Sequence, residues 1–370
     1  MSEEQNQSSF LANLLDWVLR VLQAVSVPFV AVFLAMLIGA VILAVSGASP
    51  WAAYSALFKG SFGSPEAFTR TLEKATPLVF SGLAVAFAFK GGLFNIGAQG
   101  QLLFGAIISA ALGFAIEGLP AYIHAPLALL GGALAGALFG AIPGALKTYT
   151  GAHEVITTIM LNYIAINTTD YLADGPWKDP SPSNIVARTP KILETAVVPD
   201  LGGFPVGFLL SILFAVLIWW LLQQTTLGFE IRTVGQNPDA AEYSGMKVAR
   251  TVILTMMISG FIAGMGGSIE TQGIVGRYQP GFNSGLGFEG ITIALLGKTS
   301  PFGVIPAALL VGAMDAGSSQ MQFSANVANE IVDVIQALIL FFVAADVIIR
   351  WLLRIRDEGD VVKLTTGWGK

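Results

Sequence analysis

The sequence predicts an all-α integral membrane protein with about ten transmembrane helices. Two observations lead to this fold class. Only 12% of the 370 residues are charged and 54% are hydrophobic, whereas a soluble globular domain carries roughly 25% charged residues. Long apolar runs also recur along the chain, separated by short polar segments. The bilayer is therefore the expected solvent for most of the chain.

The composition also excludes several kinds of site. The chain has no Cys and 2 His, which excludes disulfides, thiolate zinc sites and multi-histidine metal centres. We therefore expect no metal and no cofactor in this chain. The net charge of −5 is small, and we expect membrane lipid, and no nucleic acid, around the protein.

A membrane span needs roughly 20 mostly apolar residues. Five segments are clear and five are less clean, of which the short 286–297 could be a broken or half helix. The clear ones are 27–46, 124–146, 204–223, 251–268 and 329–353, and the others are 76–90, 102–117, 154–173, 286–297 and 302–320.

Basic residues set the expected orientation. With the N-terminus inside and ten crossings, 12 of the 19 Lys and Arg residues fall on the inner side, as the positive-inside rule requires. Both termini are then cytoplasmic in a bacterial inner membrane. We divide the chain into an N-terminal amphipathic segment 1–26, a transmembrane domain 27–353 and a cytoplasmic tail 354–370. The segment 1–26 reads either as an interfacial helix or as an extension of the first span.

Two segments, 47–74 and 174–203, are then expected outside. The second contains five prolines and Trp177, so we expect it to be ordered. It would cap the pore, receive a partner or simply connect two spans; these alternatives stay open.

A weak internal repeat relates 91–173 to 285–350. Ala-His-Glu-Val-Ile at 152–156 resembles Ala-Asn-Glu-Ile-Val at 328–332, and each opens a long apolar run. With ten spans the copies run in opposite directions. Inverted repeats with helices broken by glycine are typical of transporters, although Ala/Gly/Leu-rich helices can also match by chance.

Polar uncharged side chains mark a candidate solute pathway. Residues 91–101 combine four glycines with amide side chains between two apolar runs, and irregular backbone at membrane depth must be buried or line a cavity. A cytoplasmic turn after Lys90 is the alternative. The pathway candidates are Phe94, Asn95, Gln99, Gln101, Asn162, Asn167 and Glu289.

Residues 228–250 are a polar, charged island between two apolar runs. Ala240 and Ala241 predict a small-residue face on a short helix, and Gly245 predicts its end. Such a helix fits a groove in a partner protein. We therefore expect a cytoplasmic coupling loop that meets a separate ATP-driven motor.

No sequence motif for nucleotide binding or catalysis supports an enzyme. Gly285-Leu-Gly-Phe-Glu-Gly290 matches a dinucleotide pattern but follows no predicted strand. Gly297-Lys-Thr299 resembles the end of a phosphate-binding loop, yet Thr292 stands where its first glycine belongs. No Ser–His–Asp or paired-carboxylate arrangement is apparent.

Three segments together resemble the inner-membrane permeases of ATP-binding-cassette (ABC) importers for simple sugars and nucleosides, and the first two resemble nucleoside-type members most. They read Gly-Leu-Phe-Asn-Ile-Gly-Ala-Gln-Gly-Gln at 92–101, Glu-Val-Ile-Thr-Thr-Ile-Met-Leu-Asn-Tyr at 154–163 and Gly-Phe-Glu-Ile-Arg-Thr-Val-Gly-Gln-Asn-Pro-Asp-Ala-Ala at 228–241.

The resemblance implies a cytoplasmic ATPase, often two fused cassettes, which binds ATP and Mg²⁺ in place of this chain. It implies a second permease subunit, either a paralogue or an identical copy, and a periplasmic or lipid-anchored solute-binding protein. It places ATPase coupling on Glu230, Arg232, Gly235, Asn237, Ala240, Ala241 and Gly245.

The function that these features indicate is import of a neutral polar solute by alternating access, most simply a nucleoside. A simple-sugar permease is the first alternative. A branched-chain amino acid permease of the same superfamily and an ion-coupled secondary transporter using Asp315 or Asp333 are the others.

Overall fold

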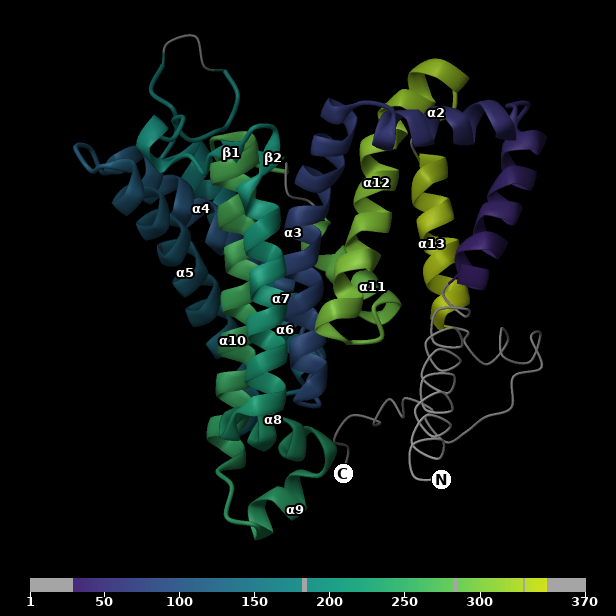
Figure 1. Cartoon of the computed structure of the whole chain (residues 1–370). Helices are drawn as coiled ribbons and strands as arrows, with labels where there is room; N and C mark the ends of the chain where they lie inside the picture. Colours follow the sequence, from purple (N-terminus) through teal and green to yellow (C-terminus); the bar gives the residue numbers. More distant parts are fainter. Residues whose placement is uncertain (1–28, 182–184, 282–284, 329, 345–370) are drawn as a thin grey trace, which may run out of the picture. The chain divides into compact units, whose positions relative to one another are not determined.

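The computed structural model describes residues 29–181, 185–281, 285–328 and 330–344. It is almost entirely helical and divides into two compact units, residues 29–56 with 321–344, and residues 57–320 (Figure 1). The predicted segments 1–26 and 354–370 lie outside the described residues.

The smaller unit contains a helix at Phe29–Val45 and α13 (Glu330–Ala344), with parts of α2 (Pro50–Phe62) and α12 (Pro301–Ala325). Its two long helices are antiparallel, because Ala31 packs near Phe342 while a Cβ on Gly39 would touch Ile335. The Tyr54 hydroxyl donates to the Met36 carbonyl at 2.6 Å and ties α2 to the first helix.

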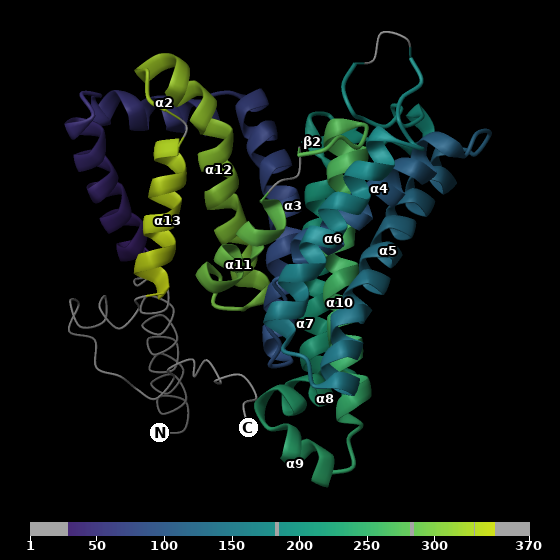
Figure 2. The ribbon, with the colours of Figure 1, turned by 180° about the vertical axis from the view of Figure 1, so that it is seen from behind.

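The larger unit holds most of the membrane helices. They are α3 (Pro65–Lys90), α4 (Ala98–Ala115), α5 (Ala121–Thr150), α6 (Glu154–Asp174), α7 (Val206–Gln224), α8 (Thr226–Gln236), α9 (Pro238–Tyr243), α10 (Val248–Ile269) and α11 (Leu286–Leu296), with the first part of α12 (Figure 2). A π-helical turn, Glu270–Val275, extends α10.

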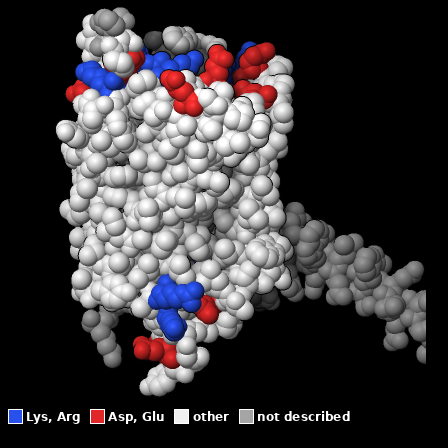
Figure 3. Space-filling model, turned by 90° about the vertical axis from the view of Figure 1, so that its left-hand side faces the viewer, with Lys and Arg blue, Asp and Glu red and all other residues white. Residues whose placement is uncertain are grey.

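Each of the ten predicted spans overlaps a helix of the described residues, and of the span 329–353 the part 345–353 lies outside them. Six helices are long and apolar enough to cross a bilayer: α3, α4, α5, α7, α10 with its π-helical turn, and α12. The helices Phe29–Val45 and α11 are apolar but shorter. One face of the larger unit shows a broad band without charge between two charged ends (Figure 3).

The segment 47–74, predicted to lie outside, is mostly helix, made of α2 and the first turns of α3. The side chain of Ser64 accepts a hydrogen bond from Ala67 N at 3.1 Å, and Pro65 follows at the first helical position. Both features start α3 eleven residues before the predicted span at 76. The first turns of α3 contain charged residues, so a search for apolar runs places the beginning of the helix too late.

Glycines let α5 and α10 pack backbone against backbone. Glycines recur every four residues along α5: Gly132, Gly136 and Gly140 meet Gly260 and Gly264 of α10, and Gly144 meets Ile253 and Met256. A Cβ on Gly264 would lie 2.9 Å from the Gly132 carbonyl oxygen and 3.0 Å from the Gly136 Cα. Small residues spaced four apart therefore allow a close contact between these two helices.

Helix directions agree with an inverted repeat. Contacts near both ends show that α5 and α3 each run antiparallel to α10, and that α12 runs antiparallel to α3. The helices α5 and α12, which precede the two matching segments 152–156 and 328–332, therefore run in opposite directions. The contacts are Gly132 with Ser268, Gly144 with Ile253, Phe80 with Gly266, Gly91 with Thr255, Gly82 with Val304 and Gly312 with Ala75.

The segment between α6 and α7 is ordered over its described part. It contains a 3-10 turn at Glu194–Ala196 and a small hairpin of β1 (Asp200–Leu201) and β2 (Phe204–Pro205). Backbone hydrogen bonds fasten it to other elements, such as Leu193 N to Gly113 O at 2.9 Å and Ile192 N to Gly276 O at 2.9 Å.

An acidic group braces the start of this segment. Hydrogen bonds from the Ser181 hydroxyl and amide hold the pKa of Asp179 below its usual range, with Arg188 and Arg277 contributing. The carboxylate lies 3.6 Å from Arg188 Nε and 3.9 Å from Arg277 Nη1.

Candidate functional site

The polar island predicted for coupling folds as two short helices, α8 and α9, next to the ends of α7 and α10 (Figure 1). The Thr225 hydroxyl accepts from Gly228 N at 3.0 Å and begins α8. The Asn237 side chain accepts from Ala240 N at 3.0 Å, and Pro238 follows at the first position of α9. Both helices therefore begin at N-cap residues of the types that favour helix starts.

Gly245 ends this short helix as predicted. Its φ is +83°, a left-handed conformation that suits glycine. Gly245 N donates to Glu242 O at 2.9 Å and Met246 N donates to Ala241 O at 3.0 Å, which is the Schellman pattern. A one-and-a-half-turn helix is thereby closed by hydrogen bonds at both ends.

The two alanines do not share a face, which corrects the predicted flat docking surface. Ala241 is fully buried, in a cluster with Ala88, Leu93 and Met256. Ala240 is exposed, together with Tyr243, whose exposure is 94%. Consecutive residues on a helix differ by 100° in direction, so one alanine anchors α9 and the other faces outward.

Gly235 joins α8 to the turn between α3 and α4. A Cβ on Gly235 would lie 2.5 Å from the Lys90 carbonyl oxygen and 2.7 Å from Gly92 N. Gly92 itself has φ +70°, and a Cβ there would lie 2.7 Å from Gly235 O. Two glycines therefore allow direct backbone contact, and Gly235 serves packing rather than an outer surface.

The remaining predicted coupling residues lie around this junction. Arg232 is half-buried and donates to the Gln223 side chain at 2.8 Å, while Glu230 is half-buried. Asn237 is exposed and acts as the cap of α9. Asp239 and Glu242 add two acidic side chains to the exposed side of α9.

Two of the predicted pathway amides, Asn95 and Gln101, are buried and satisfied within the chain. Asn95 Nδ2 donates to Gln101 Oε1 and to Ser259 Oγ, both at 2.8 Å, and Gln101 Nε2 donates back to Asn95 Oδ1 at 3.1 Å. Ser259 Oγ donates to Ala84 O at 2.7 Å. This network fastens the turn after α3 to both α4 and α10.

Gln99 and Asn162 act in the same way. Gln99 Oε1 accepts from Gly287 N at 2.8 Å, at the first turn of α11. Asn162 Oδ1 accepts from Gly100 N at 2.9 Å, and its Nδ2 donates to Ile96 O at 3.0 Å. Four of the candidates thus brace the broken stretch before α4, as irregular backbone in a membrane requires.

The other three pathway candidates differ in their surroundings. Phe94 is half-buried and meets Phe89 edge-on, with ring centroids 4.8 Å apart. Asn167 is exposed and donates to Tyr163 O of its own helix at 2.7 Å. Glu289 is half-buried on α11, two residues after Gly287, the partner of Gln99. The seven candidates therefore do not share one kind of environment.

Sequence reasoning missed two members of this region. Ser259 completes the amide network, and its signal was a hydroxyl inside the apolar run 251–268. Lys147 pairs with the buried Glu154 at 2.6 Å and closes the turn between α5 and α6. Within the described ranges, no group of three or more His, Cys, Asp or Glu residues could hold a metal ion.

Comparison with known proteins identifies the family. Residues 67–344 match the family described as branched-chain amino acid transport system / permease component. The chain belongs to this permease family.

Three relatives cover most of the chain. The guanosine ABC transporter permease protein NupP of Bacillus subtilis is 41% identical over 90% of this chain and 97% of its own. The nucleoside ABC transporter permease protein NupB of Lactococcus lactis is 36% identical, with coverages of 89% and 93%. The glucose ABC transporter permease protein TsgB13 of Haloferax volcanii is 32% identical, with coverages of 86% and 87%.

Each of the first two organisms also has a second similar permease protein, NupQ and NupC, both 30% identical to this chain. The chain is therefore a multi-pass permease subunit of an ABC transporter and not an enzyme. Permeases of this class work with an ATPase and a solute-binding protein. The ion-coupled alternative does not fit this family.

Proposed function

We propose that this chain forms part of the transmembrane pathway of a nucleoside importer. The observation that carries the proposal is its 41% and 36% identity to guanosine and nucleoside permeases over nearly its whole length. ATP and Mg²⁺ would be bound by the ATPase alone.

In this proposal α9 receives the motion of a cytoplasmic ATPase. Its exposed side, with Asp239, Ala240 and Tyr243, is available to a partner, while Ala241 is fixed in the core. A push on α9 would pass through Ala241 to α10 and through Gly235 to the turn after α3. Both packing contacts are nearly rigid because backbone meets backbone or small side chains fill the gap.

The finer assembly is also a proposal. The pairs NupP with NupQ and NupB with NupC favour a paralogous second permease over an identical copy. An ATPase of two fused cassettes would suit two unlike permeases. The α8–α9 end and both termini would be cytoplasmic, and the segment 174–203 would face a periplasmic or lipid-anchored binding protein.

The test is uptake by the complete transporter in proteoliposomes. Radiolabelled guanosine is supplied with the binding protein outside and ATP inside, and unlabelled uridine, glucose, ribose or leucine is added in excess. We expect ATP-dependent uptake that uridine reduces and that the sugars and leucine leave unchanged.

A simple-sugar permease is the second candidate, because the glucose permease TsgB13 is 32% identical over 86% of the chain. Uptake of glucose or ribose with no uptake of guanosine would replace the nucleoside proposal with this one. Uptake driven by an ion gradient without ATP would contradict both.

A further inference from the structure

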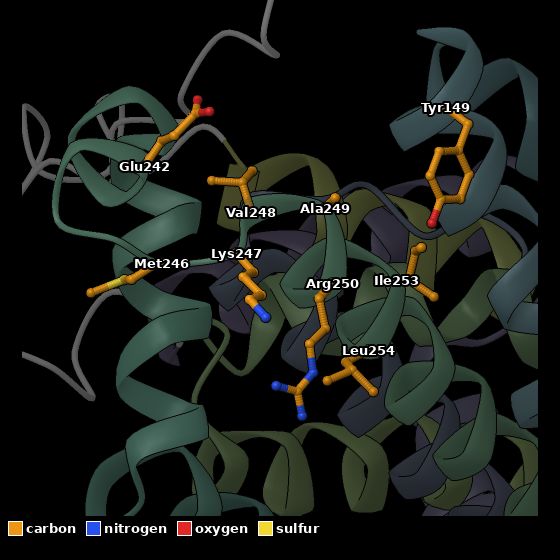
Figure 4. A pocket seen from close by; sticks show the side chains of 9 residues that line it. All are labelled: Tyr149, Glu242, Met246, Lys247, Val248, Ala249, Arg250, Ile253 and Leu254. Atoms are coloured by element: carbon orange, nitrogen blue, oxygen red, sulfur yellow. The ribbon is translucent and has the colours of Figure 1, made fainter.

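A second feature lies at the α8–α9 end, beside the proposed coupling surface, with Glu242 of α9 in its lining. An open depression of about 640 Å³ is formed where α5 ends and α10 begins. Its lining includes Tyr149, Met246, Lys247, Arg250, Ile253 and Leu254 (Figure 4). Two cations thus stand beside partly buried aliphatic side chains.

The two cations have no partner in the described part of the chain. Lys247 and Arg250 are exposed, and no side-chain hydrogen bond or ion pair to described residues engages either of them. Lys247 directly precedes α10, and Arg250 lies in the first turn of that helix. Figure 4 shows both heads extending to the same side, whereas the Glu242 carboxylate points the other way.

The aliphatic side of the depression continues into the uncharged band. Ile253 and Leu254 lie one turn into α10, in the span that begins at Val248. On α5, large side chains are exposed at spacings of three and four residues toward the same end. They are Leu134, Leu138, Ile142, Leu146 and Tyr149. Such a stripe faces acyl chains, and a tyrosine at its end is typical of the bilayer boundary.

We propose that this depression binds one anionic phospholipid of the leaflet at the α8–α9 end. The phosphate would lie between Lys247 and Arg250, and the acyl chains would lie along Ile253, Leu254 and the α5 stripe. The first amides of α10 add a partial positive charge at the same place. Basic pockets between membrane helices are suited to acidic head groups.

The mixed lining favours a lipid over a contact with the ATPase. A soluble protein would meet the two cations but would leave the aliphatic half of the depression uncovered. A phospholipid has an anionic head group that can meet the two cations and apolar chains that can cover the adjoining aliphatic side chains. This inference concerns no solute and stands independently of the nucleoside proposal.

The experiment is native mass spectrometry of the complete transporter. It is equilibrated in detergent with equal amounts of dioleoyl-phosphatidylglycerol and dioleoyl-phosphatidylcholine. Wild type is compared with Lys247→Gln/Arg250→Gln and with the control Lys59→Gln/Arg70→Gln. The control removes two exposed cations on α2 and α3, far along the chain and at the opposite end of α3 from Lys90.

Wild type and control should retain phosphatidylglycerol in preference to phosphatidylcholine. Loss of both cations should lower that preference by about 30-fold, since each cation near an anionic surface contributes roughly fivefold. The charge-preserving variant Lys247→Arg/Arg250→Lys should keep the preference, which separates charge from misfolding.

Three outcomes would overturn the proposal. The first is equal retention of the two lipids by wild type. The second is an equal loss in the control variant. The third is full lipid retention in Lys247→Gln/Arg250→Gln with loss of the ATPase from the complex, which would assign the two cations to the protein partner.

Discussion

Replacing Gly235 by Ala should uncouple this transporter by moving α8 away from the turn after α3. The added Cβ would lie 2.5 Å from Lys90 O, and ordinary van der Waals contact begins near 3.4 Å. The opposing atoms are all backbone, so no side chain can swing aside. The end of α8 would have to retreat by roughly 0.9 Å.

Overpacking of this kind typically costs about 1–3 kcal/mol. If the strain acts on the coupled state, ATP-driven uptake should fall roughly 5- to 150-fold. Initial rates of guanosine uptake in proteoliposomes measure this effect, and the thermal midpoint of the purified complex reports the loss of stability.

The matched control is Gly151→Ala at the turn between α5 and α6. Gly151 has φ +71° and no neighbouring atom lies within 4 Å of the place that an added Cβ would take, so the change strains one residue without displacing a neighbour. Uptake should stay near the wild-type rate. Wild-type uptake by Gly235→Ala, or an equal loss in both variants, would refute the argument that this backbone contact transmits motion.

Three further predictions concern the braces around the site. Asn95→Ala leaves buried polar groups of the amide network unpaired and should lower the free energy of unfolding by about 1–3 kcal/mol in a denaturant titration. Asn167→Ala, at an exposed position, should change that free energy by less than about 0.5 kcal/mol. Equal effects of the two variants would contradict the network. Lys147→Met leaves Glu154 buried without its cation and should lower the thermal midpoint of the protein. The double variant Lys147→Met/Glu154→Gln should recover part of that loss. An unchanged midpoint in Lys147→Met would show that this ion pair does not stabilise the fold. The pKa of Asp179 is lowered in the folded state, so the stability that this carboxylate contributes is present above about pH 4 and is lost as pH falls through the lower folded pKa. Asp179→Asn should therefore reduce the loss of stability at acid pH. An unchanged acid limb of the stability–pH curve would contradict this.

The sequence predicted the helices well where their ends carry local signals. Each of the ten predicted apolar runs overlaps a helix, and Gly245 marked the end of α9 because a left-handed residue is needed there. The start of α3 escaped the same reasoning. Its first turns contain Glu66, Arg70 and Lys74, so a search for apolar runs excludes this part of the helix. Ser64 and Pro65 nevertheless indicate that a helix begins there.

The site was harder to predict because residue type does not reveal direction. Ala240 and Ala241 look alike in the sequence, yet one is exposed and the other is buried. Asn95, Gln99 and Gln101 were proposed to contact solute, but the structure satisfies them within the chain. An amide suits both purposes equally, and only the positions of Ser259 and Gly287, far away in sequence, decide between them.

The central claim is that α9 is the contact for the ATPase, and crosslinking tests it most directly. The chain contains no Cys, so Tyr243→Cys carries a single thiol on the exposed side of α9. A benzophenone attached there should crosslink to the ATPase in the complete transporter. The same label on Leu201→Cys, exposed in β1 of the segment between α6 and α7, should not. Crosslinking from position 201 with none from position 243 would contradict the account.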